Sequence, residues 1–290
     1  MIRRALGAFA GVLLAGCAAQ EASARPPIWV VRDADSELVL FGSVHVLPPG
    51  LDWRPPALDA ALAKADDLWF ELPIDAASEA KVGQLAAARG MLPPDQSLSR
   101  MLSPDGAQRL ERAAADLGVS MAVLDRLEPW FAEVALAGAQ FMKSGADANS
   151  GVEKTLAASA PASAARKAFE SPEEQIAIFD AAPLPEQIAS LEESLRELER
   201  NPRAYDELVA VWMAGDLKAL DDDALGPIRK AAPGLYARLV TQRNERWIKA
   251  IRARMDGSGK TVVVVGVGHL VGADGLPMRL RALGYEVEGP

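Results

Sequence analysis

The most constraining feature of this sequence is an uninterrupted run of β-branched residues near its C-terminal end, Thr261-Val262-Val263-Val264-Val265, which glycines at once terminate. A strand with apolar side chains on both sides must be covered on both faces, which is typical of a central strand in a parallel sheet. The run therefore predicts an α/β fold. The chain has 290 residues, half of them hydrophobic, enough to form such a core without a disulfide or structural metal.

Other short apolar segments complete the predicted sheet. Segments 28–31 and 38–41 are separated by Asp33-Ala34-Asp35-Ser36, residue types that form turns, so we expect a hairpin. Leu68-Trp69-Phe70 has the length of a strand, and Tyr285 and Val287 predict a last strand at an edge of the sheet.

The middle of the chain has a helical pattern. Two helix starts are marked by a serine cap before a first-turn proline, Ser103-Pro104-Asp105 and Ser171-Pro172-Glu173-Glu174. One apolar helix face is predicted from Leu124, Leu127, Phe131, Val134 and Phe141. We expect one α/β domain at residues 27–290, with a small central, largely parallel sheet built from both ends of the chain and a large helical insertion at about 98–255.

The N-terminus has the layout of a secretory signal peptide over residues 1–16, because two arginines precede a short apolar stretch and small residues. Leu14-Ala15-Gly16-Cys17 resembles the lipobox of bacterial lipoproteins, and Cys17 is the only cysteine in the sequence. We expect Cys17 to be acylated, with residues 17–26 as a tether to the membrane. Since residue 18 is alanine and not aspartate, we expect an exported protein at the outer membrane, facing the periplasm. A free thiol at Cys17 is the alternative.

The charge of the chain bears on its partners. The formal net charge is -9 at pH 7, which disfavours contact with phosphate backbones and anionic lipid headgroups. Nucleic acid is therefore not an expected partner, whereas a peptide or another small substrate is compatible with this balance.

The chain has two histidines, and each stands just after an apolar strand-like run and a glycine, in Gly42-Ser43-Val44-His45 and Gly266-Val267-Gly268-His269. In α/β sheets, ligands bind beyond the carboxyl ends of the strands. If the two strands are parallel, both imidazoles emerge at the same edge. Taken singly, each histidine could be a hydrogen-bonded core or surface residue.

Two acidic residues could join the histidines. Glu71 directly follows Leu68-Trp69-Phe70. Glu170 directly follows Lys167-Ala168-Phe169, a less apolar segment with a weaker strand pattern. An acid beside Trp69 and Phe70 needs a cationic partner to stay charged when it is buried. Two imidazoles and a carboxylate, His45, His269 and Glu71, suit a divalent metal such as zinc, manganese, cobalt or ferrous iron. Without metal, the same residues could work as a general base with an orienting acid.

Arg243 is a candidate for substrate contact. Leu239, Arg243 and Trp247 recur every four residues along a predicted helix, so Arg243 points to the core side. A guanidinium there must pair with carboxylates, carbonyls or an anion. Arg243 could stabilise an oxyanion, or it could form a structural salt bridge with Glu170 or Glu71.

Together these residues resemble the TraB/GumN family from about residue 27 to residue 288. The resemblance rests on five ordered segments: 41–48 around His45, 69–72 around Glu71, 210–216, 243–247 from Arg243 and Asn244 to Trp247, and 265–272 around His269. It implies that the two Gly-x-x-His motifs and Glu71 form an active site, with metal dependence reported in the Tiki branch. Asn244 is a further candidate within its segment. The sequence departs from the family at Gly151-Val152-Glu153, where relatives usually have aspartate.

Two functions follow as hypotheses. The first is a metal-dependent hydrolase, with peptide bonds as expected substrate, in which His45, Glu71 and His269 hold the metal and Arg243 stabilises negative charge. The second is a non-catalytic lipoprotein that binds or sequesters a peptide, a metal or haem.

Overall fold

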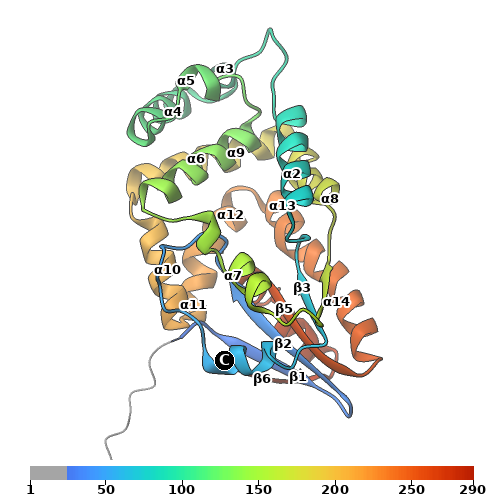
Figure 1. Ribbon diagram of the computed structural model, residues 1–290. Helices are drawn as coiled ribbons and strands as arrows, with labels where there is room; N and C mark the ends of the chain where they lie inside the picture. The colour runs from blue at the N-terminus through green and yellow to red at the C-terminus, as the bar shows by residue number, and fades with distance from the viewer. Residues whose placement is uncertain (1–24) are drawn as a thin grey trace, which may run out of the picture.

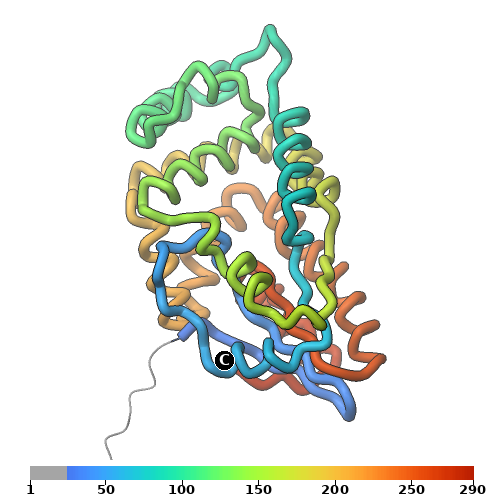
Figure 2. Tube along the Cα trace, viewed as in Figure 1, coloured from blue at the N-terminus to red at the C-terminus, as the bar shows by residue number. Residues whose placement is uncertain are grey.

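The computed structural model describes residues 25–290, so the predictions about the signal peptide and Cys17 lie outside the described residues. Its centre is a six-stranded sheet in the order β4-β3-β5-β2-β1-β6 (Figure 1). The strands are β1 (Ile28–Arg32), β2 (Ser36–Ser43), β3 (Asp67–Phe70), β4 (Ala165–Ala168), β5 (Gly259–Gly266) and β6 (Glu286–Glu288). Strands from the two ends of the chain lie side by side, as the blue and red segments of Figure 2 show.

The sheet is largely parallel, which confirms the predicted architecture. β2 and β5 are parallel neighbours over their whole length, and β3 pairs parallel with both β5 and β4. β1 forms the predicted antiparallel hairpin with β2, and β6 is the edge strand beyond it.

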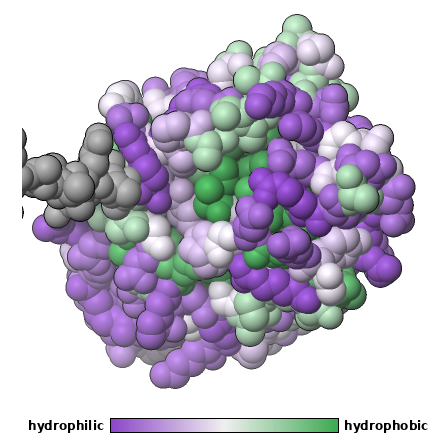
Figure 3. All heavy atoms as spheres, turned by 90° about the horizontal axis from the view of Figure 1, so that it is seen from below, coloured by the Kyte–Doolittle hydropathy of each residue, from purple (hydrophilic) through white to green (hydrophobic). Residues whose placement is uncertain are grey.

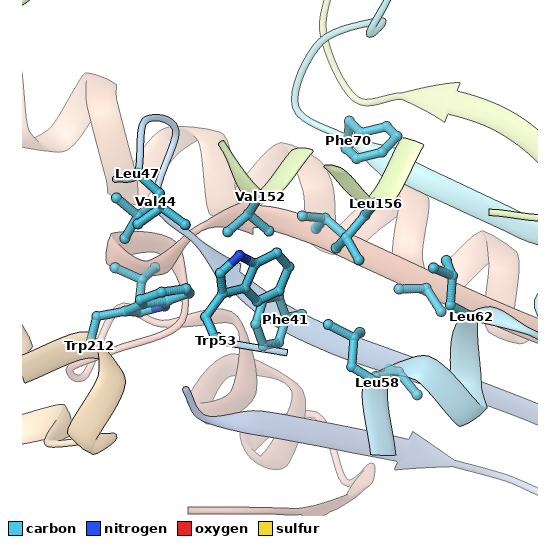
Figure 4. Close-up of a cluster of buried hydrophobic side chains, with 14 of the residues drawn as sticks. Phe41, Val44, Leu47, Trp53, Leu58, Leu62, Phe70, Val152, Leu156 and Trp212 are labelled. Carbon is cyan, nitrogen blue, oxygen red and sulfur yellow. The ribbon is translucent and has the colours of Figure 1, made fainter. Parts of the chain in front are cut away.

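The apolar run of β5 is covered on both faces, as the sequence predicts. Val262 and Val264 pack in one buried cluster and Val263 and Val265 in another. The first cluster is formed with α1 (Pro56–Leu62), α7 (Val152–Ser159) and α10 (Ala204–Ala214), and Figure 4 shows its Phe41, Trp53 and Trp212 side chains together. The second is formed with α14 (Gln242–Met255) and α15 (Leu276–Ala282). Two layers of helices thus fix the positions of the strand ends.

The remaining helices are α2 (Ala76–Arg89), α3 (Leu98–Met101), α4 (Pro104–Leu117), α5 (Met121–Leu124), α6 (Pro129–Lys143), α8 (Pro172–Asp180), α9 (Leu184–Arg200), α11 (Leu217–Ala219), α12 (Gly226–Ala231) and α13 (Pro233–Tyr236). Shorter helical turns are η1 (Ala148–Ser150), η2 (Leu220–Leu225), η3 (Ala237–Thr241) and η4 (Val267–His269), of which η2 and η3 are π-helical. Both predicted serine caps are confirmed, and Ser171 forms the capping box with Glu174.

The helical insertion differs from the prediction in two ways. It contributes β4 to the sheet, so residues 98–255 are not helical throughout. The predicted face from Leu124 to Phe141 is also wrong as a single helix face, because α5 ends at Leu124 and α6 begins at Pro129. Val134 is 44% exposed, since α6 turns its other side to the core formed with α4 and α9.

The surface seen from below is mainly polar, with apolar residues gathered near the middle of that face (Figure 3). Over residues 25–290, no helix combines the length and the apolar character needed to cross a bilayer.

Candidate functional site

The ends of three parallel strands place the candidate residues at one edge of the sheet. Ser43 at the end of β2 pairs with Gly266 at the end of β5, and Phe70 at the end of β3 pairs with Val264. The next residues in the chain therefore leave the sheet together: Val44 and His45 after β2, Glu71 after β3, and η4 with His269 after β5. The shared edge that the Gly-x-x-His pattern indicates is present.

Arg243 of α14 lies at the centre of the site and is almost completely buried, with 5% of its side chain exposed. Its Nη2 donates to Glu71 Oε2 at 2.5 Å and to Glu170 Oε2 at 2.8 Å, and its Nε donates to Glu170 Oε1 at 2.9 Å. Burial disfavours ionised Glu71, but Arg243, the two histidines and the Gly266 N–H together outweigh burial and hold the pKa of Glu71 well below its usual range. Glu71 is therefore a carboxylate at neutral pH.

His269 is held in one tautomer by its neighbours. Asn244 donates through Nδ2 to the carbonyls of His269 and Asp274, so its Oδ1 must accept from His269 Nδ1, at 2.7 Å. The other ring nitrogen, Nε2, faces Arg243 Nη1 at 3.1 Å and must accept from it, because arginine only donates. Burial, partly against the Trp247 ring, lowers the pKa of His269 to about 3. His269 is a neutral imidazole.

His45, unlike His269, is held in its charged form by its neighbours. Its Nδ1 lies 2.6 Å from Glu153 Oε1 on α7, which also accepts from the Ser43 hydroxyl at 2.5 Å. The negative charge of Glu153 raises the pKa of His45 to about 9, and Glu71 adds to this. The side chain is 65% exposed, and its Nε2 has no hydrogen-bond partner among residues 25–290. His45 is thus the solvent-facing histidine of the site.

Two glycines permit this arrangement. A Cβ on Gly151 would collide with the His45 carbonyl, so only glycine lets the start of α7 approach the His45 loop. A Cβ on Gly266 would lie 3.1 Å from Glu71 Oε1 and 3.7 Å from His45 Nε2, so both side chains converge on the space beside Gly266. Glu71 Oε1 also accepts from the Gly266 backbone N–H at 2.6 Å and lies 3.8 Å from His269 Nε2.

The donor atoms do not converge on a position for a metal ion. Glu71 Oε2 and His269 Nε2 both face the Arg243 guanidinium, which takes the position between them that a shared cation would occupy. Residues 25–290 contain no group of three or more His, Cys, Asp or Glu side chains arranged to hold a metal. As arranged, the residues fit an arginine and not a metal ion, because two cations there would repel each other. Metal binding by His45, Glu71 and His269 stays a prediction.

A comparison with protein family models identifies the family of this chain. The model of the TraB/PrgY/gumN family matches residues 27–289. The chain belongs to this family. Two similar curated proteins are the uncharacterized protein YbaP of Escherichia coli K12 and its counterpart in Shigella flexneri, each 26% identical over 258 residues, covering 88% of this chain and 92% of theirs. No solved structure matches significantly.

The candidate site contains one residue that the sequence did not assign to it. Glu153 appeared only as a departure from the usual aspartate, whereas the structure places its buried carboxylate on His45. The sequence feature that could have indicated Glu153 is the Gly-Val-acid segment at the start of a helix. Nothing in the sequence linked this segment to His45. The secondary candidates both contact predicted site residues: Glu170 binds Arg243, and Asn244 binds His269.

Proposed function

We propose that this TraB/PrgY/gumN member is a hydrolase that cleaves peptide bonds, with His45 as its general base. The supporting observation is the pairing of His45 with buried Glu153, which orients the ring and leaves Nε2 facing solvent beside Glu71. Neutral His45 takes a proton from water through Nε2, and the resulting imidazolium is stabilised by Glu153. The proton then passes to the leaving amine when the hydroxyl has added to the carbonyl carbon.

In this proposal Arg243 positions Glu71 and His269 and does not contact the substrate. Its N–H groups are used by Glu71, Glu170, His269 and the Leu239 carbonyl, so none remains for a substrate. The salt-bridge alternative therefore describes its contacts better than the role of oxyanion donor. Arg243 helps to keep Glu71 ionised, and burial together with Arg243 keeps His269 neutral beside the reacting water.

The proposal is tested by assaying the detergent-solubilised full-length protein on a quenched-fluorescence peptide library, with chelator and with added Mn, Co, Zn or Fe(II) ions. We expect cleavage that persists in chelator and that increases with pH up to about 9, where His45 loses its proton. His45→Ala should lower kcat by roughly 100-fold or more, the usual contribution of a general base. Lys154→Ala, a surface change on the same helix as Glu153, is the matched control.

Each alternative gives a different result. Cleavage that appears only with added metal would support the metal-dependent hydrolase that the sequence predicts. Absence of cleavage in all conditions would favour a protein that binds or sequesters a peptide, a metal or haem. One observation favours this second candidate: the polar groups of Arg243, Glu71 and His269 are already satisfied by one another.

We also propose that Cys17 is acylated and anchors the exported protein at the outer membrane, facing the periplasm. The support is the lipobox-like Leu14-Ala15-Gly16-Cys17 and the absence of any other cysteine. Cys17→Ser should abolish incorporation of radiolabelled fatty acid and move the protein from the detergent phase to the aqueous phase. A Cys17→Ser protein that keeps its label would contradict the proposal.

A further inference from the structure

A second feature of the molecule is a cavity of about 840 Å³ between helices of the insertion, which is partly open to solvent. Its walls come from α6, α9, α10, α11, η2, α12 and η3, and Figure 1 labels the five α-helices among them. None of the four predicted site residues His45, Glu71, Arg243 and His269 lines it. The cavity is therefore a separate space whose lining can be considered independently.

The lining of the cavity is acidic and apolar. No lysine, arginine or histidine belongs to it, and its apolar surface includes Phe141, Leu208 and Ile228. Six carboxylic acids line it: Glu133, Glu193, Glu197, Glu207, Asp222 and Asp223. A ligand that matches this lining carries a positive charge on an apolar body, because an anion would meet repulsion from most sides.

Three of these acids have no positively charged partner in the described part of the protein. Glu207 accepts a hydrogen bond from the neutral Asn201 side-chain amide. Glu133 accepts hydrogen bonds from the hydroxyls of Ser190 and Ser194 only, and burial raises the pKa of its carboxyl. The exposed side chain of Asp223 makes no hydrogen bond or ion pair with any residue in 25–290. By contrast, Glu193 and Asp222 are paired with Arg200 and Lys218. Glu133, Glu207 and Asp223 are therefore the lining acids available to an incoming cation.

Three lining residues connect the cavity to the candidate site. The Tyr205 hydroxyl donates to the Val46 carbonyl at 3.0 Å, directly after His45 in the chain. Leu225 lies 3.0 Å from the position of a Cβ on Gly268, directly before His269. The Leu239 carbonyl accepts from Arg243 Nη1 at 3.3 Å. A molecule in the cavity thus lies next to the loops that carry both histidines.

Both π-helical segments of the described chain contribute to this wall. Five of the six residues of η2 line the cavity, Leu220 and the four from Asp222 to Leu225, and Leu239 belongs to η3. π-Helical turns are rare and often mark functional sites, since they displace side chains from their regular helical positions. Here they direct acidic and apolar side chains into one space.

We propose that this cavity binds the basic side chain of a peptide substrate, a lysine or arginine, and so sets the specificity of the neighbouring site. The apolar walls accommodate the aliphatic stem, and Glu133 and Asp223 receive the charged end. Calling the peptide a substrate rests on the proposed hydrolase function. Binding of the basic side chain in the cavity does not require that the peptide is cleaved.

The test is fluorescence anisotropy of the full-length protein with a labelled, capped tetrapeptide that contains two arginines. The matched probe carries citrulline, which has the same shape without the charge. We expect the arginine peptide to bind at least about tenfold more tightly, and Glu133→Gln/Asp223→Asn to remove most of this preference. Glu111→Gln/Asp116→Asn, two exposed acids of α4 outside this cavity, changes net charge equally and should leave the preference intact.

The outcomes separate this inference from the proposed function. His45→Ala should bind the arginine peptide as the wild type does, because His45 is outside the cavity. Equal affinity for both peptides, binding of neither, or an unchanged preference in Glu133→Gln/Asp223→Asn overturns the cavity proposal. Tight, charge-dependent binding without any cleavage supports the cavity and contradicts the hydrolase.

Discussion

Replacing Arg243 with alanine is expected to lower the free energy of unfolding by about 3–5 kcal/mol at pH 7, the range for breaking a buried ion pair by removal of one partner. The reason is that Glu71 and Glu170 would remain buried without their guanidinium. Urea denaturation followed by tryptophan fluorescence measures the loss, since Trp247 packs against Arg243.

The matched control for this prediction is Arg246→Ala. Arg246 pairs with the same Glu170, at 3.2 Å, but its side chain is 51% exposed. Exposed ion pairs typically contribute about 1 kcal/mol or less, so Arg246→Ala should change stability little. Equal effects of the two substitutions would contradict the view that Arg243 neutralises a buried acidic pair.

The two histidines are expected to titrate far apart in the metal-free protein, with pKa values of about 9 for His45 and about 3 for His269. Glu153 favours the charged form of His45. Burial and the charge of Arg243 disfavour the charged form of His269. Because the chain has two histidines, imidazole NMR signals followed from pH 5 to 10 in chelator can be assigned with His45→Ala alone. One signal should move near pH 9, and the other should not move.

The shifts also predict the direction of the pH effect on stability. The folded-state pKa of His45 lies above its usual 6.5, so its stabilising contribution is complete below pH 6.5 and is lost as pH rises through about 9. The folded-state pKa of His269 is lowered, so its contribution is complete above pH 6.5 and declines as pH falls toward 3. Glu153→Gln should bring the pKa of His45 back toward 6.5, because it removes the neighbouring negative charge.

Titration of both histidines near pH 6.5 in the unmodified protein would contradict the predicted pKa shifts.

The sequence predicted the sheet well because strands and their ends carry strong local signals. The valine run of β5 indicated cover on both faces, and glycine followed by histidine marked the ends of β2 and β5. Arg243 could be assigned to the core from helical spacing alone, and both of its suggested carboxylate partners contact it.

The remaining features depend on contacts between distant segments. Glu153 reaches His45 only because α7 packs on the sheet, and its own segment reads as an ordinary helix start. The placement of α14 puts the Arg243 guanidinium between Glu71 and His269. The sequence could not predict this position, because a glutamate and a histidine suit a metal ion equally well. The π-helical turns that form the cavity wall have no clear sequence signature, and Asp221-Asp222-Asp223 reads as a solvated turn.

The pairing of β2 with β5 has a consequence for how the protein is made. More than 200 residues separate these neighbours, so β2 and β5 cannot pair until β5 has been synthesised. Such high contact order slows folding, because a long loop must close before its strands can pair. A nascent or truncated chain without β5 leaves β2 and β3 with unpaired edges. In that state the unpaired strand edges are exposed to aggregation until β5 is present.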